Sequence, residues 1–344
     1  IEIIFIIICS LILTNKIIKI NFLIKLLIVL NILIAFESLF IYQKYNFENL
    51  KFIFFFRFIL FAIIISYIFS LKKKIFKNLI ILLVIIFVTL FLDSILQFSS
   101  GKNIFGLVTE NHYRVSSFFG DEYILGSYVG RMMPILISSV YFFINKKRTD
   151  KIILFILILS LLLCLISGDR SSLIFPIVSL LIFSLIDFHK KKITLFIFSI
   201  FCLGIIFTSN TINQRYINQS LDGSFYNNKL IYISPSHHNY AVVSLNMFKE
   251  KKFFGHGFKS FRKLCEKERF HGKTIETVPK CSTHSHNYYL QFLSENGLFN
   301  FAILLIIFIY VTIKLIKLIY DNFSKNLKRS KSLIFAYAGV FISL

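Results

Sequence analysis

The sequence predicts an all-α fold: a polytopic bundle of about ten transmembrane helices, with one large external loop that contains short helices. Composition is the first reason, because 56% of the 344 residues are hydrophobic and the mean hydropathy is +0.73, above the balance of soluble domains. Spacing is the second reason. The apolar residues form blocks of about 20, the length that crosses a hydrocarbon core of roughly 30 Å, and short basic segments separate the blocks.

The predicted spans follow directly from these blocks. They are residues 1–13, 20–41, 52–71, 78–98, 123–145, 152–167, 171–188, 193–209, 298–319 and 332–344. The first and last are expected to be incomplete, because the sequence opens and stops within an apolar run. The long run 152–188 is divided at the polar residues Ser167–Ser172, since polar groups cannot lie unsatisfied against lipid.

Orientation is predicted from the basic residues of the connections between spans. One alternating set of connections holds 19 Lys and Arg and the other set holds five, so the first set is expected on the cytoplasmic side. The same alternation places the loop 210–287 outside. That loop is itself basic, but long loops cross the membrane largely regardless of their charge.

Four regions are expected along the chain: N-terminal spans 1–98, core spans 99–209, the loop 210–287 and C-terminal spans 288–344. Within the loop, apolar residues recur at near-helical spacing from His237 to Phe254, which predicts an interfacial helix. Gly255 and Gly257 are expected to end that helix.

Charge and motif content exclude several functions. The formal net charge is +22, but Lys and Arg gather at helix ends, where they orient spans in lipid, so nucleic-acid binding is not expected. The sequence has no Asp-x-Asp, no phosphate-cradling glycine loop and no Gly-x-Ser-x-Gly motif. Metal-dependent sugar transfer, NTP hydrolysis and the usual serine-hydrolase chemistry are therefore disfavoured.

A histidine pair before the ninth span is the first candidate for chemistry. The segment Thr283–Asn287 contains His284 and His286 and precedes two tyrosines. A His-x-His pair could bind metal, but no third ligand lies at suitable spacing. A neutral histidine at a membrane boundary suits general-base work, because its ordinary pKa lies near ambient pH. Solvated loop histidines without a catalytic role are the alternative.

Arginines near the external ends of spans are the second candidate. Arg170 lies in the turn Gly168–Ser172, Arg114 precedes the acidic pair Asp121-Glu122, and Arg215 follows the eighth span. An arginine held at membrane level tends to mark function, and its planar fork can grip two phosphate oxygens. The alternatives are a topological role, a helix-dipole role or an ordinary polar loop.

Two further sets of residues carry structural predictions. Cys265 and Cys281 both lie in the external loop, where an oxidising compartment permits a disulfide. Charged residues also lie within or near the ends of spans, and some of them are expected to face the bundle interior or to pair. These residues are Glu37, Arg57, Asp93 and Arg131.

Taken in order, these motifs resemble the O-antigen ligase and O-antigen polymerase superfamily of bacterial membrane glycosyltransferases. The resemblance covers about 110 to 310, and its most specific part is the last. Its motifs are Arg114…Phe119-Gly120-Asp121-Glu122, Ser167-Gly168-Asp169-Arg170-Ser171, Arg215, Phe254-Gly255-His256-Gly257-Phe258, and Cys281-Ser282-Thr283-His284-Ser285-His286-Asn287 with Glu295-Asn296-Gly297-Leu298. Ser285 stands where the family often has proline, and Asp169 is a bulky residue for the turn, which leaves the subfamily open.

The resemblance implies an activity at the periplasmic face of the bacterial inner membrane. Such enzymes transfer a glycan from undecaprenyl pyrophosphate to an acceptor hydroxyl, on lipid A-core in ligases and on a second lipid-linked repeat unit in polymerases, without metal, ATP or another cofactor. His286 is the expected catalytic base. The residues expected to bind pyrophosphate or glycan are Arg170, Arg215, Arg114, His284, Asn287 and Glu122. A transporter of lipid-linked sugars is the competing hypothesis, in which the cations would line a path through the membrane.

Overall fold

The structure is a computed structural model. It describes residues 22–40, 56–71, 73–108, 114–143, 149–186, 199, 203–204, 210–218, 225–226, 229–231, 234–325 and 328–343. The described residues are mostly helical, as predicted. The predicted span 1–13 and nearly all of the predicted span 193–209 lie outside them.

The chain divides into two compact units. The first contains Ile1–Lys73 and Leu221–Ile309, and the second contains Lys74–Ser220 and Tyr310–Leu344.

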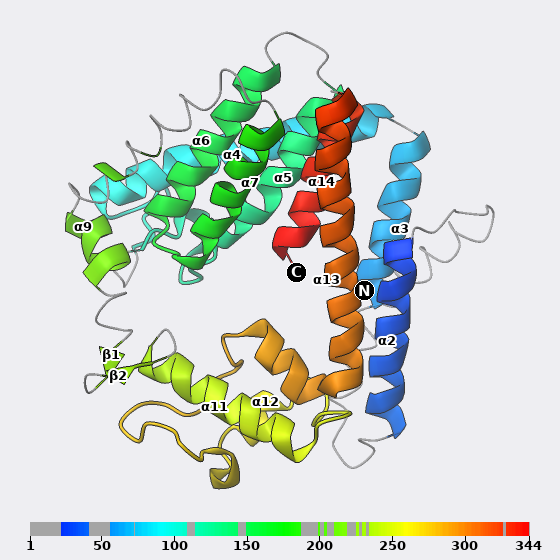
Figure 1. Ribbon diagram of the computed structural model, residues 1–344. Helices are drawn as coiled ribbons and strands as arrows, with labels where there is room; N and C mark the ends of the chain where they lie inside the picture. Colours follow the sequence, from blue (N-terminus) through cyan, green and yellow to red (C-terminus); the bar gives the residue numbers. More distant parts are fainter. Residues whose placement is uncertain are drawn as a thin grey trace. The chain divides into compact units, whose positions relative to one another are not determined.

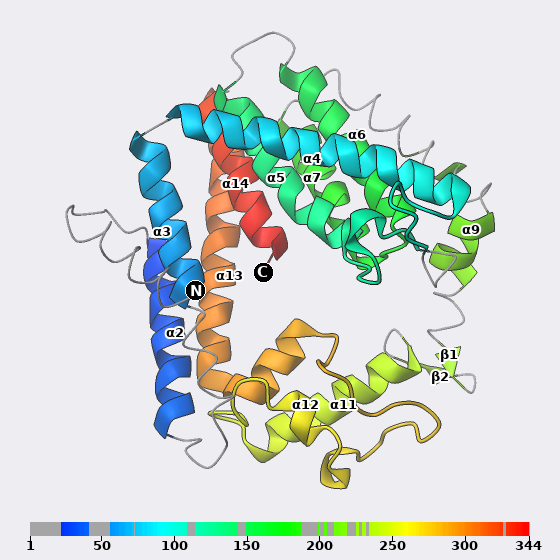
Figure 2. The same ribbon diagram turned by 180° about the vertical axis from the view of Figure 1, so that it is seen from behind.

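In the first unit, α2 (Phe22–Phe40) packs beside α3 (Phe56–Leu71) and the N-terminal part of α13 (Tyr288–Lys325), as Figures 1 and 2 both show. A buried polar pair fixes α2 against α13, since the Asn300 Nδ2 donates to the Glu37 carboxylate. Glu37 thus faces a neighbouring helix, as predicted for some of the charged residues within spans.

The segment before α13 has its own small core in the same unit. It contains the short antiparallel strands β1 (Phe225–Tyr226) and β2 (Lys229–Leu230), the helices α11 (Pro235–Glu250) and α12 (Phe261–Leu264), and the 3-10 turn η5 (Glu268–Phe270). The buried core residues are Tyr240, Val243, Met247, Phe261, Cys265 and Phe270. A helix is therefore present where one was predicted, between His237 and Phe254, although α11 already ends at Glu250, before Gly255; its interfacial position stays a prediction.

The second unit is a helix bundle built around α5 (Leu125–Phe143). Its other elements are α4 (Lys73–Ser100), the 3-10 turn η2 (Ser117–Phe119), α6 (Thr149–Ile166), the 3-10 turn η3 (Ser171–Leu173), α7 (Ile174–Ile186), α9 (Asn210–Asn213), the π-helical turn η4 (Gln214–Asn218) and α14 (Lys328–Ser343). Figure 2 shows α4 crossing the bundle of α5, α6 and α7, and its residues Phe87 and Leu90 join the common apolar core.

The predicted division of 152–188 is confirmed. Helix α6 ends at Ile166, a turn follows at Ser167–Arg170, and η3 leads into α7. Close packing of this turn on α5 requires small residues. A Cβ at Gly126 would collide with the hydroxyls of Ser167 and Ser172.

Three helical segments of the described residues are long and apolar enough to cross a membrane: Lys77–Ser100, Thr149–Ile166 and Tyr288–Asn322. Two shorter apolar helical segments, Ser171–Ile186 and Lys331–Phe341, accompany them. The total of about ten spans and the external position of the loop stay predictions.

Candidate functional site

The turn after α6 is held in place by Asp169. One oxygen of the Asp169 carboxylate accepts from the Ser171 amide at 3.2 Å and from the Ser171 hydroxyl at 2.7 Å. The other oxygen accepts from the Ser127 hydroxyl of α5 at 2.8 Å. These bonds fix the backbone around Arg170, which is half-buried. The polar residues predicted to interrupt the membrane run therefore tie the turn to α5.

Arg215 reaches the same turn from η4. Its Nε donates to the Gly168 carbonyl at 2.9 Å, and the neighbouring Tyr216 hydroxyl lies 3.0 Å from the carbonyl oxygens of both Cys164 and Leu165. Burial lowers the pKa of Arg215, and the positive charges of Arg170 and Arg114 lower this pKa further. The charges of Arg170 and Arg114, which come from two other segments, therefore act on Arg215.

Arg114 completes this arginine cluster, which we define as Arg114, Arg170 and Arg215. Its Nη2 donates to the Tyr123 carbonyl at 3.0 Å, and its guanidinium lies 4.3 Å from the centre of the Tyr123 ring. Among the residues that the structure describes, the buried Arg114 Nε has no hydrogen-bond partner. Burial lowers the pKa of Arg114, while Asp169 acts in the opposite direction. Since a buried unpaired donor is costly, this N–H suits an anionic ligand.

The loop that carries Arg114 is fixed by polar residues near the end of α4. The Gln97 side-chain oxygen accepts from the amides of Ser116 and Ser117 at 3.1 and 2.7 Å. The Asp93 carboxylate accepts from the Ile104 amide and the Ser117 hydroxyl. Asp93 therefore faces the interior, as predicted for some charged residues within spans. Glu122, a predicted glycan-binding residue, is exposed on this loop.

A second cluster surrounds His286 in the first unit. Its ring centre lies 4.0 Å from that of His284, 5.1 Å from that of His237 and 5.4 Å from that of Tyr240, on which it stacks. The Ser282 hydroxyl lies 3.4 Å from His286 Nε2. We call His237, Tyr240, His284 and His286 the histidine cluster. The predicted base is thus packed among rings from the loop and from α11.

These neighbours keep His286 neutral. Partial burial, followed by the nearby His284 and His237, lowers the pKa of His286 from 6.5 to about 4. At neutral pH its imidazole is therefore neutral, with one protonated ring nitrogen and one that can accept a proton. The unprotonated nitrogen is what a general base requires, while a pKa below the operating pH makes it a weaker base.

His237 and Tyr240 were not predicted from the sequence as site residues. They lie three residues apart on one face of α11, where both reach His286. Ser234 caps this helix and places its hydroxyl 2.6 Å from the Nδ1 of His237. The available signal was the Ser-Pro pair, a helix-start signature, followed closely by two histidines.

Asn287 and Glu295 have structural roles in this unit. The Asn287 side-chain oxygen accepts from the Leu290 amide at 3.1 Å and caps α13. The buried Glu295 carboxylate accepts from the amides of Lys259 and Phe261 at 3.0 and 3.1 Å. Both motif residues therefore shape the backbone around the histidine cluster, and glycan binding by Asn287 stays a prediction.

The loop glycine Gly255 packs against Gly297, the glycine that interrupts α13. Gly255 and Gly297 both have a φ of +71°. A Cβ at Gly255 would collide with the Glu295 backbone, and one at Gly297 with the Phe253 carbonyl. The Gly257 amide donates to the Glu295 carbonyl at 2.7 Å. Only glycine allows this contact.

The structure joins Cys265 and Cys281 in a disulfide, with their Cα atoms 5.0 Å apart. Cys265 is fully buried in the core of the segment before α13. The bond therefore fastens the start of the Cys281–Asn287 segment to that core.

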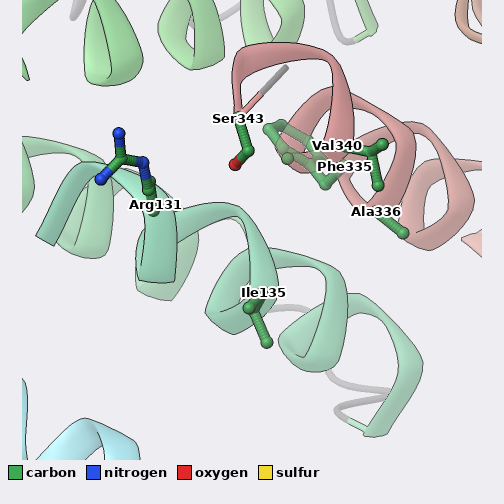
Figure 3. A pocket seen from close by; sticks show the side chains of 7 residues that line it. Arg131, Ile135, Phe335, Ala336, Val340 and Ser343 are labelled. Atoms are coloured by element: carbon green, nitrogen blue, oxygen red, sulfur yellow. The ribbon is translucent and has the colours of Figure 1, made fainter. Parts of the chain in front are cut away.

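Among the described residues, the predicted site residues form no metal-binding group, and they do not line the groove between α5 and α14. The described residues contain no group of three or more His, Cys, Asp or Glu side chains that could hold a metal ion. A groove of about 300 Å³ lies between α5 and α14. Figure 3 shows its labelled lining: Arg131, Ile135, Phe335, Ala336, Val340 and Ser343. Arg131 also lies 5.6 Å from the Phe175 ring centre.

The arginine cluster belongs to the second unit and the histidine cluster to the first. Each is assembled within its own unit from residues distant in sequence. Their convergence on one substrate stays a prediction.

Comparison with known proteins finds a family match over part of the chain. Residues 155–305 match the family model described as O-antigen ligase, a segment that includes Arg170, Arg215 and His286. No curated protein and no solved structure matches the chain. Together with the apolar helices, this match supports an integral membrane protein. Over residues 155–305 the chain is therefore similar to the O-antigen ligase family.

Proposed function

We propose that the protein is an O-antigen ligase-like glycosyltransferase of the bacterial inner membrane. It moves a glycan from undecaprenyl pyrophosphate to an acceptor hydroxyl of lipid A-core at the periplasmic face. The family match carries this proposal, because the matched residues include Arg170, Arg215 and His286. Arginine side chains bind phosphate, and His286 is the candidate base.

The proposed reaction breaks the bond between the anomeric carbon and the pyrophosphate oxygen and forms one to the acceptor oxygen. His286 takes the acceptor proton as that oxygen attacks. Undecaprenyl pyrophosphate leaves with the electrons of the broken bond. The bond to pyrophosphate supplies the driving force, so the proposed reaction needs no NTP and no metal.

The arginine cluster supports a role in stabilising the leaving group. Positive side chains aimed where negative charge develops lower the barrier most in a site that excludes water. The unpaired buried Nε of Arg114 and the half-buried position of Arg170 and Arg215 fit that requirement. We therefore assign pyrophosphate binding to all three, with glycan contacts from His284, Asn287 and Glu122.

The histidine cluster supports the assignment of the base. His286 is neutral at neutral pH because burial and two neighbouring histidines lower its pKa. His237 and Tyr240 hold the ring from the α11 side. We propose that they orient His286.

A polymerase activity, which joins lipid-linked repeat units, is the second candidate. The same arginines and base would serve it, because only the acceptor differs. The segment Cys281–Asn287 favours the ligase by its resemblance to that branch of the superfamily.

Reconstitution tests the proposal. The protein in liposomes would receive undecaprenyl-pyrophosphate-linked glycan together with either lipid A-core or excess lipid-linked glycan. We expect glycan on lipid A-core, while longer lipid-linked glycan would identify the polymerase. Translocation of the lipid-linked glycan without any transfer would support a transporter and contradict the enzyme proposal.

A further inference from the structure

An exposed aromatic group lies where α13 changes direction. Phe253 is 57% exposed, Phe254 45% and Phe299 53%. The ring centres of Phe253 and Phe254 lie 5.7 and 5.4 Å from that of Phe299. Lys251 and Lys252, also exposed, precede the two phenylalanines. A contiguous apolar group of this kind on a protein surface marks an interaction site.

The backbone fixes this group to the start of a membrane run. Gly297 interrupts the helical dihedrals of α13 with φ 71° and ψ −175°. The next two amides lose their helical acceptors at this break. The Leu298 amide instead donates to the Lys252 carbonyl at 2.9 Å, and the Phe299 amide to the Phe253 carbonyl at 3.4 Å. The segment Lys251–Phe254 therefore caps the part of α13 that begins at Leu298.

That part of α13 has the length and surface of a transmembrane helix. It is mostly apolar from 298 to 319, apart from Asn300, Lys314 and Lys317, and at 1.5 Å per residue it spans roughly 30 Å of hydrocarbon. Exposed apolar side chains continue along it from Phe299, at Leu305, Ile306, Ile309, Ile313 and Ile316. The aromatic group thus continues the exposed apolar surface of this helix at the end where the helix resumes, at Leu298.

We propose that Lys251–Phe254, together with Leu298 and Phe299, is an interfacial anchor that binds the segment before α13 to the lipid headgroups of the adjacent leaflet. Aromatic rings favour this boundary, and lysine side chains extend from it toward anionic headgroups. The anchor holds the segment before α13 at its junction with that helix. Only the first part of α13, from Tyr288 to the break at Gly297, separates this junction from His286. The partner is the bilayer surface.

The absence of tryptophan from the sequence allows a direct test. Phe253→Trp places a single indole in the anchor, and Lys273→Trp places one at an exposed loop position as the matched control. Both variants would be reconstituted in nanodiscs containing phosphatidylglycerol. We expect the emission of Phe253→Trp to be blue-shifted relative to the control and quenched by lipids brominated near the headgroup. Phe254→Trp repeats the test at the second ring.

Two outcomes would overturn the proposal. One is emission of both anchor variants at the control wavelength, with acrylamide but not brominated lipid quenching them. The other is a blue shift without quenching by brominated lipid, which indicates a protein contact. Lys252→Glu tests the charge. It should reduce the quenching of Phe253→Trp in phosphatidylglycerol nanodiscs but not in phosphatidylcholine ones. If Lys252→Glu leaves the quenching of Phe253→Trp unchanged in both kinds of nanodisc, the electrostatic part of the proposal is wrong.

Discussion

At the residue scale, the environment of His286 explains why this histidine suits a base better than His256 and His271 do. His256 and His271 each place Nε2 2.9 Å from a backbone carbonyl, of Met247 and Cys265 respectively. These contacts give His256 and His271 a structural role. His286 instead stacks on Tyr240 and has a hydroxyl near its Nε2, so its ring can meet a substrate hydroxyl.

The first prediction concerns the base itself. His286→Ala should lower the turnover of glycan transfer by about 10²–10⁴-fold, the usual contribution of a general base. Transfer to the acceptor in liposomes measures it. His271→Gln, which alters a histidine outside the cluster, is the control and should keep turnover within the range of wild type after correction for inserted protein. Near-wild-type transfer by inserted His286→Ala would refute the assignment.

The second prediction concerns pH. A base works when unprotonated, and the pKa of His286 is lowered to about 4 from 6.5. The transfer rate should therefore persist well below the ordinary histidine pKa and fall only as pH approaches about 4. His237→Asn removes one of the repelling charges, so it should move this acidic limb to higher pH. A pH profile of kcat/KM checks both statements, and an unchanged limb in His237→Asn would show that His237 does not act on the base.

At the element scale, the contact between the two glycine motifs explains why they occur together in the sequence. Gly255 follows α11 and Gly297 interrupts α13, and each backbone occupies the space that a side chain on the other would need. The role of this contact is to fasten the loop to α13. The histidine cluster depends on that junction because His286 directly precedes α13.

The third prediction separates this packing from backbone strain. Gly106 has a φ of +79° but open space around it, whereas Gly297 has a φ of +71° and a backbone carbonyl in contact. Gly106→Ala should cost only the positive-φ penalty, about 1–2 kcal/mol. Gly297→Ala should lower the Tm considerably more, since backbone must move. Thermal unfolding of the purified variants measures both, and equal Tm losses would contradict the packing account.

The fourth prediction concerns the disulfide of the loop. The Cys265–Cys281 bond closes a separation of 16 residues, which in the chain-entropy model stabilises the fold by about 3 kcal/mol. Cys281→Ser should lower the Tm and abolish the effect of a reductant on it. Cys164→Ala, a change of a buried free thiol, should leave the reductant effect intact. A wild-type Tm that does not respond to reductant would contradict the prediction.

At the scale of the whole molecule, hydrophobic spacing was sufficient to predict the helical class, the break at Ser167–Ser172 and the helix α11. These features depend on local sequence. Gln97, His237 and Tyr240 were not predicted, because their importance comes from contacts with residues far away in the chain. Gln97 in particular reads as an ordinary polar residue at a helix end, and only its bonds to the Ser116 and Ser117 amides reveal its role.

The central claim is that the arginine cluster and His286 meet around one lipid-linked pyrophosphate. Crosslinking tests it most directly. Ser171→Cys lies beside Arg170 and Thr283→Cys beside His284, and both positions are exposed. In a chain with Cys9, Cys164 and Cys202 replaced by alanine, a short bis-maleimide would be applied to this pair and to the control pair Ser171→Cys with Lys273→Cys.

The account predicts that the first pair crosslinks within one chain, that undecaprenyl pyrophosphate blocks the reaction, and that the control pair reacts much less. Labelling of Ser171→Cys and Thr283→Cys from opposite sides of the membrane, or crosslinking no better than the control while each cysteine still reacts singly, would contradict it.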